Sequence, residues 1–161
     1  AAIACLKEHP DAHVATLVTP LHEKEALHDP SVVKAELTPW VGECFQQESG
    51  SLNQPWRAIT FSRAAVPAAR EWKDSLLGKI PPLFWQHIGV YAYRRSVLKN
   101  WHRLPESPLS ELESLEQLRL IEAGKLMIAV AIDQAASGID TAADYSAFVK
   151  RFFDQKEKAQ R

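Results

Sequence analysis

The run from Phe84 to Tyr93 constrains the fold of this chain more than any other stretch, because aromatic and β-branched residues at this density form a β-strand. Alternate residues of a strand face the same side, so His87, Gly89 and Tyr91 share one face. Glycine has no side chain, which leaves open space between the imidazole and the phenol. The pattern predicts either the wall of a small polar pocket or, more commonly, a buried histidine and tyrosine with backbone partners.

The rest of the chain predicts alternating strands and helices. The opposite face of the Phe84–Tyr93 strand, with Ile88 and Val90, is expected to point into the core. Strands alternating with helices indicate an α/β domain with a mixed sheet. Further strands are expected at 14–19, 32–37, 57–62 and 126–132, with 57–62 antiparallel to 32–37. Helices are expected at 1–9, 23–28, 94–102, 110–123 and from Thr141 onward, the last with a core stripe of Tyr145, Phe148, Val149 and Phe152.

Composition excludes several classes of protein. The chain has 161 residues, of which 46% are hydrophobic and 24% charged, as in one ordinary globular domain. Its formal net charge is -1, so no nucleic-acid or membrane-surface partner is expected. No apolar run is long enough to span a bilayer. The two cysteines, Cys5 and Cys44, lack CxxC spacing, which argues against a zinc site and fits a reducing compartment.

The predicted helix at 110–123 carries an unusual carboxylate. Ser110 and Glu113 have the spacing of a capping box, and Gly124 is a natural stop. Glu116 falls in the middle of an apolar stripe formed by Leu109, Leu112 and Leu120. A buried charge needs a partner, so an arginine, a metal or a ligand hydroxyl is expected beside it. The alternative is a surface pair of Glu116 with Arg119 on a rotated helix.

Two more polar residues stand at informative positions. Gln117 lies beside Glu116 and offers both a donor and an acceptor. Asp140 lies just before Thr141, in the strand-to-helix loop where open α/β sheets bind ligands. A lone aspartate there is more often a turn residue than a metal ligand. The chain opens at Ala1 without a methionine or a helix-capping residue, so we expect upstream sequence to be missing.

Taken together, these segments resemble the C-terminal part of the 3-deoxy-manno-octulosonate (KDO) cytidylyltransferase family. The resemblance covers nearly all of the chain, and the matching segments occur in the family's order. They are VATLVTPL (14–21), DPSVVK (29–34), FSRA (61–64), HIGVYAYR (87–94), SPLSELESLEQLRL (107–120) and GIDT (138–141).

The resemblance implies a nucleotide-diphospho-sugar-transferase-like α/β fold with a mixed sheet and a hairpin or dimerisation region. Residues 1–161 would be a single partial domain. It also implies a cytoplasmic homodimer that transfers CMP from CTP to KDO, releasing pyrophosphate, for lipopolysaccharide synthesis. The residues implied to line the sugar-acid site are Arg63, His87, Tyr91, Glu116 and Gln117, with Arg70 as a second functional arginine and Asp140 as a Mg²⁺ ligand.

The implied mechanism is in-line nucleotidyl transfer, in which positioning and charge neutralisation dominate. Asp140 and Arg63 would be catalytic: the aspartate through Mg²⁺, the arginine through the KDO carboxylate, which a guanidinium fork matches. The Glu116 carboxylate and the Gln117 amide would discriminate among polyol acids.

The chain also departs from the family pattern. The family's N-terminal half carries an Arg-Leu-Pro-Gly-Lys nucleotide loop and a GDEP segment, and neither occurs here. The connection 38–55 is longer than the family's turn, and Ala135-Ala136 replaces a usual Pro-Gly. We therefore expect a truncated form that is inactive alone.

Three other interpretations stay open at this point. One is a cytidylyltransferase for another sugar acid, such as amino-KDO or an acylneuraminate. Another is a non-catalytic sugar-acid-binding or dimerisation module. The last is a domain with no ligand site, which Glu116→Leu would then stabilise.

Overall fold

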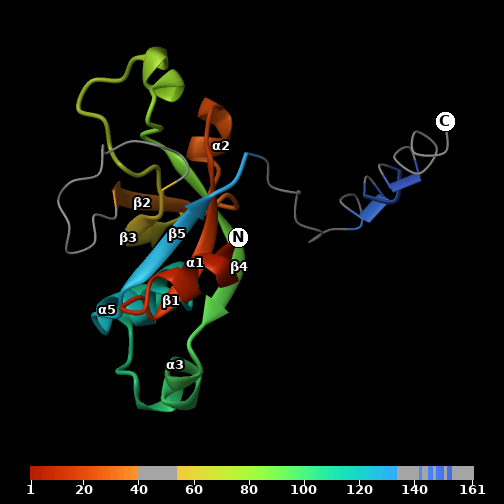
Figure 1. The fold of residues 1–161 in the computed structure, drawn as a ribbon. Coiled ribbons are helices and arrows are strands. Elements are labelled where there is room, and N and C mark those ends of the chain that lie inside the picture. Colours follow the sequence, from red (N-terminus) through yellow and green to blue (C-terminus); the bar gives the residue numbers. More distant parts are fainter. Residues whose placement is uncertain (40–53, 134–141, 143–144, 147, 151, 154–161) are drawn as a thin grey trace.

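The computed structural model describes residues 1–39 and 54–133, together with 142, 145–146, 148–150 and 152–153 (Figure 1). Five strands lie in these ranges: β1 (Val14–Pro20), β2 (Lys34–Pro39), β3 (Trp56–Ser62), β4 (Trp85–Tyr93) and β5 (Met127–Ala131). The predicted strands are therefore confirmed, with bounds shifted by a few residues. Most of the connection 38–55, and Asp140 itself, lie outside the described residues.

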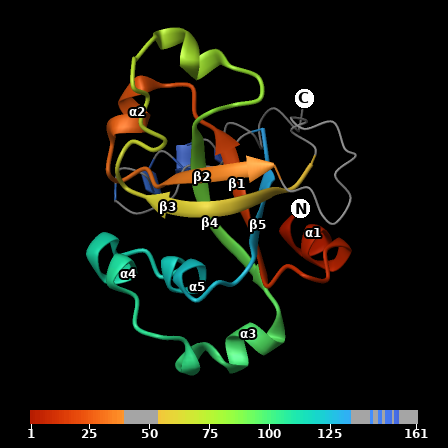
Figure 2. The same ribbon diagram turned by 90° about the vertical axis from the view of Figure 1, so that its left-hand side faces the viewer.

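The five strands form one sheet that closes on itself in the order β1-β4-β2-β3-β5. Strand β5 returns to β1 in parallel, and the other neighbours are antiparallel. The sheet is therefore mixed, as expected, and the predicted antiparallel pairing of β2 with β3 is confirmed. Its closure was not predicted. Figure 2 shows β2 and β3 crossing the direction of β4, β1 and β5.

Short helices surround this sheet. Helix α1 packs against β1, β4 and β5, and α5 packs against β3. Helix α3 lies at one end of the molecule and α2 near the other (Figure 1). Their bounds are α1 (Ala2–Glu8), α2 (Lys24–His28), α3 (Arg95–Lys99), α4 (Pro108–Glu113) and α5 (Leu118–Glu122), with 3-10 turns η1 (Asp74–Gly78) and η2 (Trp101–Arg103).

The prediction of one helix over 110–123 is wrong. Ser107 is the N-cap of α4 and accepts a hydrogen bond from the Ser110 backbone N–H, with Pro108 at the first helical position. Ser114 then adopts a left-handed conformation (φ 52°), which ends α4 and separates it from α5. Gly124, at φ 67°, follows α5 as the predicted stop.

This break changes which side chains are buried. Leu109 and Leu112, expected in an apolar stripe, are 44% and 80% exposed, whereas Leu120 is fully buried. The predicted core stripe near the C-terminus is also wrong, because its aromatic residues Tyr145, Phe148 and Phe152 are exposed. The helical residues that carry them stand apart from the sheet (Figure 1).

Strand β4 contains an irregularity that the alternation rule missed. Thr16 pairs with Tyr91 but its neighbour Leu17 pairs with Ile88, so Gly89 and Val90 form a bulge. Val90 is 53% exposed and does not point into the core, which corrects the prediction made for it. The main core is built mostly from aliphatic and aromatic side chains of all five strands and of α5. Among the described residues, no helix has the length and apolar character needed to cross a membrane.

Candidate functional site

The first predicted site residue, Arg63, is held in place by the end of α4. Its Nε donates to the Glu113 carbonyl (2.7 Å) and its Nη1 to the Pro30 carbonyl (2.9 Å). The Arg63 backbone N–H donates to Glu113 Oε2 (2.6 Å), and the Ser62 hydroxyl donates to both carboxylate oxygens of Glu113. Among the described residues, two of the five guanidinium donors are therefore engaged by carbonyls.

Glu113 is a site-organising residue that the sequence reasoning missed. The sequence placed it in a capping box with Ser110, but the structure uses its carboxylate to fasten the end of β3 to α4. The signal was present in Ser107-Pro108, since a serine followed by proline marks a helix start. With that start, Glu113 falls at the end of the helix and is free to bind elsewhere.

Lys34 lies near Arg63 and Glu113, and the sequence reasoning missed it too. Its side chain is fully buried, and Nζ donates to the Asp29 carbonyl (2.8 Å) and to that of Val32. Burial lowers the pKa of this ammonium, while the Asp29 charge opposes the shift. The DPSVVK segment is thus tied to its own lysine, beside the Arg63 and Glu113 charges.

His87 and Tyr91 lie together, as the sequence predicted. The two rings are 5.4 Å apart between centroids, and the Phe61 ring of β3 lies 4.6 Å from the imidazole. His87 is only 8% exposed, and its Nε2 lies 2.9 Å from the Thr16 hydroxyl oxygen. Burial lowers the pKa of His87 from 6.5 to about 4, so the imidazole is neutral at pH 7. A Cβ built at Gly89 would meet nothing within 4 Å, so there is open space beside this exposed glycine.

Tyr91 connects this pair to the α4–α5 turn. Burial raises the pKa of its phenol, and the negative charges of Glu116 and, less, of Tyr93 raise it further. The same two causes, burial and then Glu116, raise the pKa of Tyr93. Both phenols are therefore neutral, and Glu116 lies close enough to affect each of them.

Glu116 itself does not sit where it was expected. Its side chain is exposed at the turn between α4 and α5, so the prediction of a carboxylate buried in an apolar stripe is wrong. The guanidinium of Arg119, offered as the alternative partner, donates instead to the carbonyls of Pro105 (2.8 Å) and Leu104. Glu116 therefore lies at the rim of the cluster with its carboxylate open to solvent.

Gln117 is the buried member of the pair. Its side chain is 1% exposed, between the core residues Leu115 and Leu118 of the same turn. Its Nε2 is buried without a hydrogen-bond partner among the described residues. An unpaired buried amide is expensive. Gln54 Nε2 and Trp56 Nε1 are in the same state, and Gln117 is the one of the three that was predicted for the site.

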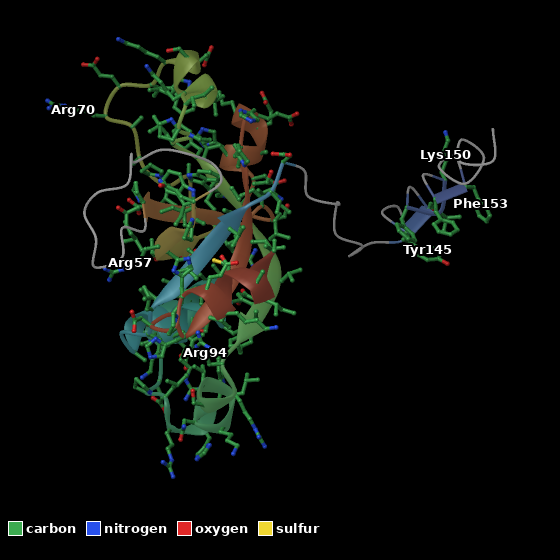
Figure 3. All side chains as sticks on the ribbon, in the orientation of Figure 1. Arg57, Arg70, Arg94, Tyr145, Lys150 and Phe153 are labelled. Atoms are coloured by element: carbon green, nitrogen blue, oxygen red, sulfur yellow. The ribbon has the colours of Figure 1, made fainter. Side chains whose placement is uncertain are left out.

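Among the described residues, no hydrogen bond joins Arg63, Glu116 or Gln117 to the His87–Tyr91 pair. Two further predicted residues stand outside these groups. Arg70 is exposed, and Figure 3 shows it at the outer edge of the segment that follows β3. Asp140 lies outside the described residues, so its part as a metal ligand stays a prediction. Within the described ranges, no group of three or more histidine, cysteine, aspartate or glutamate side chains could hold a metal ion.

The fold agrees with what similar proteins show. The sequence model of a family described as cytidylyltransferase matches residues 1–128. The chain belongs to this cytidylyltransferase family.

The names of similar proteins specify the sugar acid as well. A 3-deoxy-manno-octulosonate cytidylyltransferase of Rhodopirellula baltica is 42% identical over 93% of this chain and 54% of its own length. One of Nitrosococcus oceani is 38% identical over 86% of this chain and 49% of its own. A solved CMP:2-keto-3-deoxy-manno-octonic acid synthetase in complex with CTP superposes with a TM-score of 0.71 and 32% identity, covering 96% of this chain and 54% of that one. The chain thus spans about half the length of the relatives it matches.

Proposed function

We propose that this chain carries the sugar-acid end of a CMP-KDO synthetase, which transfers CMP from CTP to KDO and releases pyrophosphate for lipopolysaccharide synthesis. The observation that carries the proposal is the His87–Tyr91 pair, whose phenol feels the charge of Glu116, together with the buried, unpartnered Nε2 of Gln117, the next residue of the same turn. Relatives named for 3-deoxy-manno-octulosonate favour KDO over the amino-KDO or acylneuraminate alternatives.

The chemistry of the cluster suits a polyhydroxylated acid. The neutral imidazole and phenol bind sugar hydroxyls without adding charge. The Gln117 amide donates to a hydroxyl or carboxylate oxygen, while Glu116 at the rim accepts from a hydroxyl. Arg63 supplies a positive charge and its remaining N–H donors to the carboxylate.

These residues would act on the reaction through position. The KDO anomeric hydroxyl attacks the α-phosphorus of CTP, and pyrophosphate leaves in line. Holding the sugar acid rigidly converts the attack into an effectively intramolecular step. A Mg²⁺ ion on Asp140 belongs to the proposal, and its chemistry when bound would be to offset charge at the phosphate. Arg70 would serve as an outer contact.

The remaining parts of the proposal concern the assembled enzyme. We propose that it is a cytoplasmic homodimer with CTP and KDO as its small-molecule partners. Because the chain spans about half of each relative, CTP turnover would need the remainder of such a protein. The isolated chain is therefore expected to be inactive.

A chimera tests this function. The chain replaces the matching 54% of the Rhodopirellula baltica relative, and CMP-KDO formation from CTP, KDO and Mg²⁺ is measured beside the parent enzyme. We expect turnover by the chimera and none by the isolated chain. A folded chimera that binds CTP but forms no CMP-KDO would contradict the proposal, and turnover by the isolated chain would contradict its incompleteness.

A further inference from the structure

The bulge in β4 places a buried hydroxyl against the imidazole of the site. Thr16 is fully buried on β1, opposite the point where Gly89 and Val90 interrupt the β1–β4 register. Its hydroxyl lies 2.9 Å from the Val90 carbonyl oxygen and 3.3 Å from that of Ile88. A backbone carbonyl has no proton, so the Thr16 hydroxyl is the donor in these contacts.

This donation decides which nitrogen of His87 is protonated. The Thr16 oxygen is also 2.9 Å from His87 Nε2. A hydroxyl has one proton, and the Thr16 proton is committed to the carbonyl side of the bulge. If it turned toward His87 instead, two oxygen lone pairs would face each other across 2.9 Å at Val90. Nε2 must therefore donate to Thr16, which leaves Nδ1 of the neutral ring without a proton.

We propose that Thr16 is a positioning residue that locks His87 in the Nε2–H form, so that Nδ1 is presented to the site as a hydrogen-bond acceptor. Among the described residues, Nδ1 has no hydrogen bond of its own. The ligand group that fits it is a donor, and in a sugar acid that group is a hydroxyl. This last step rests on the proposed function, whereas the locked tautomer does not.

The proposal depends on the hydroxyl at this position, which two substitutions separate from the shape of the side chain. Serine would keep the oxygen, while valine would keep the approximate shape of threonine and remove the contacts of the hydroxyl with the two β4 carbonyls and with His87. Thr16→Val would leave Nε2–H facing a methyl group, so the proton is expected to move to Nδ1 in a large part of the molecules. Nδ1 would then donate and repel a donor hydroxyl.

Nuclear magnetic resonance of the ¹⁵N-labelled 161-residue chain tests this directly, through the long-range proton–nitrogen couplings of the His87 ring. We expect the Nε2–H pattern in the wild type and in Thr16→Ser, and a mixed or Nδ1–H pattern in Thr16→Val. Circular dichroism confirms that each variant is folded. An Nδ1–H pattern in the wild type would overturn the proposal, as would an unchanged Nε2–H pattern in folded Thr16→Val. If Thr16→Val does not fold, the wild-type and Thr16→Ser spectra decide alone.

A KDO titration separates this inference from the function. Binding is expected to shift the Nδ1 resonance of the wild type, with at least a tenfold loss of affinity in Thr16→Val and little loss in Thr16→Ser. If the wild-type ring is in the Nε2–H form but its Nδ1 resonance does not shift with KDO, the sugar-acid site is contradicted and the tautomer assignment is upheld. Equal KDO affinity in wild type and Thr16→Val would overturn the acceptor role of Nδ1.

Discussion

Replacing Gln117 by methionine should stabilise the free protein and abolish its affinity for the sugar acid. Nε2 of Gln117 is buried without a partner, and the side chain is 1% exposed. A buried unsatisfied donor costs about 1–3 kcal/mol. Methionine has a similar length and shape and carries no strong polar group. Subtracting a repacking cost of up to about 1.5 kcal/mol, we expect a net gain near 1 kcal/mol in the free energy of unfolding.

Urea unfolding followed by tryptophan fluorescence measures this gain. The slope of the transition should be the same in both proteins, because the surface exposed on unfolding does not change. Gln86→Met is the matched control, since the side chain of this half-buried glutamine on β4 has no buried, unpartnered nitrogen or oxygen, and no stabilisation is expected there. A loss of about 1 kcal/mol or more in Gln117→Met would refute the reasoning, because it would mean that the amide is hydrogen-bonded in the free protein.

The same variants connect stability to binding. At a KDO concentration of roughly 100 times the dissociation constant, linkage should stabilise the wild type by about 2.7 kcal/mol. Gln117→Met should gain little, so the order of stability of the two proteins reverses when KDO is present. Parallel gains in both proteins would show that Gln117 does not contact the ligand.

The remaining predictions concern His87, Glu113 and Ser107. Burial lowers the pKa of His87 from 6.5 to about 4, so the neutral ring contributes its full stability above pH 6.5 and loses it as the pH falls to 4. The free energy of unfolding should drop by up to about 3 kcal/mol across that window. His87→Gln should flatten this part of the pH profile. Glu113→Ala should lower the free energy of unfolding by about 1–3 kcal/mol and weaken KDO binding severalfold. Glu111→Ala, on the exposed side of α4, is the control and should do neither. Equal effects of the two variants in calorimetry would contradict the anchoring role of Glu113. Ser107→Ala should lower the free energy of unfolding by about 1 kcal/mol, measured by thermal unfolding, and Ser110→Ala should change it little. A larger loss in Ser110→Ala would mean that the helix begins at Ser110, as expected from the sequence.

Periodicity was sufficient for the strands because each is short, apolar and bounded by turn residues. The β4 strand was placed within one residue, and its pairing of His87 with Tyr91 followed from alternation. Alternation failed at Val90, because a bulge depends on pairing with β1 and leaves no mark on one strand alone. The ring-shaped closure of the sheet also depends on contacts between distant strands.

The helix before the site shows a different limit. Helical spacing continued across residue 114, but a serine in the left-handed conformation ended the helix there, and serine gives little warning of this conformation. Glu116 was therefore expected in the core and is exposed, while Gln117 is buried. The family resemblance named both residues for the site without revealing this division of roles.

A crystal structure of this chain grown with KDO shows directly where the sugar acid binds. We expect the sugar acid against His87 and Tyr91, with one of its oxygens within hydrogen-bond distance of Gln117 Nε2. KDO ordered elsewhere, for example beside Arg70, with the Gln117 amide still without a contact, would contradict it.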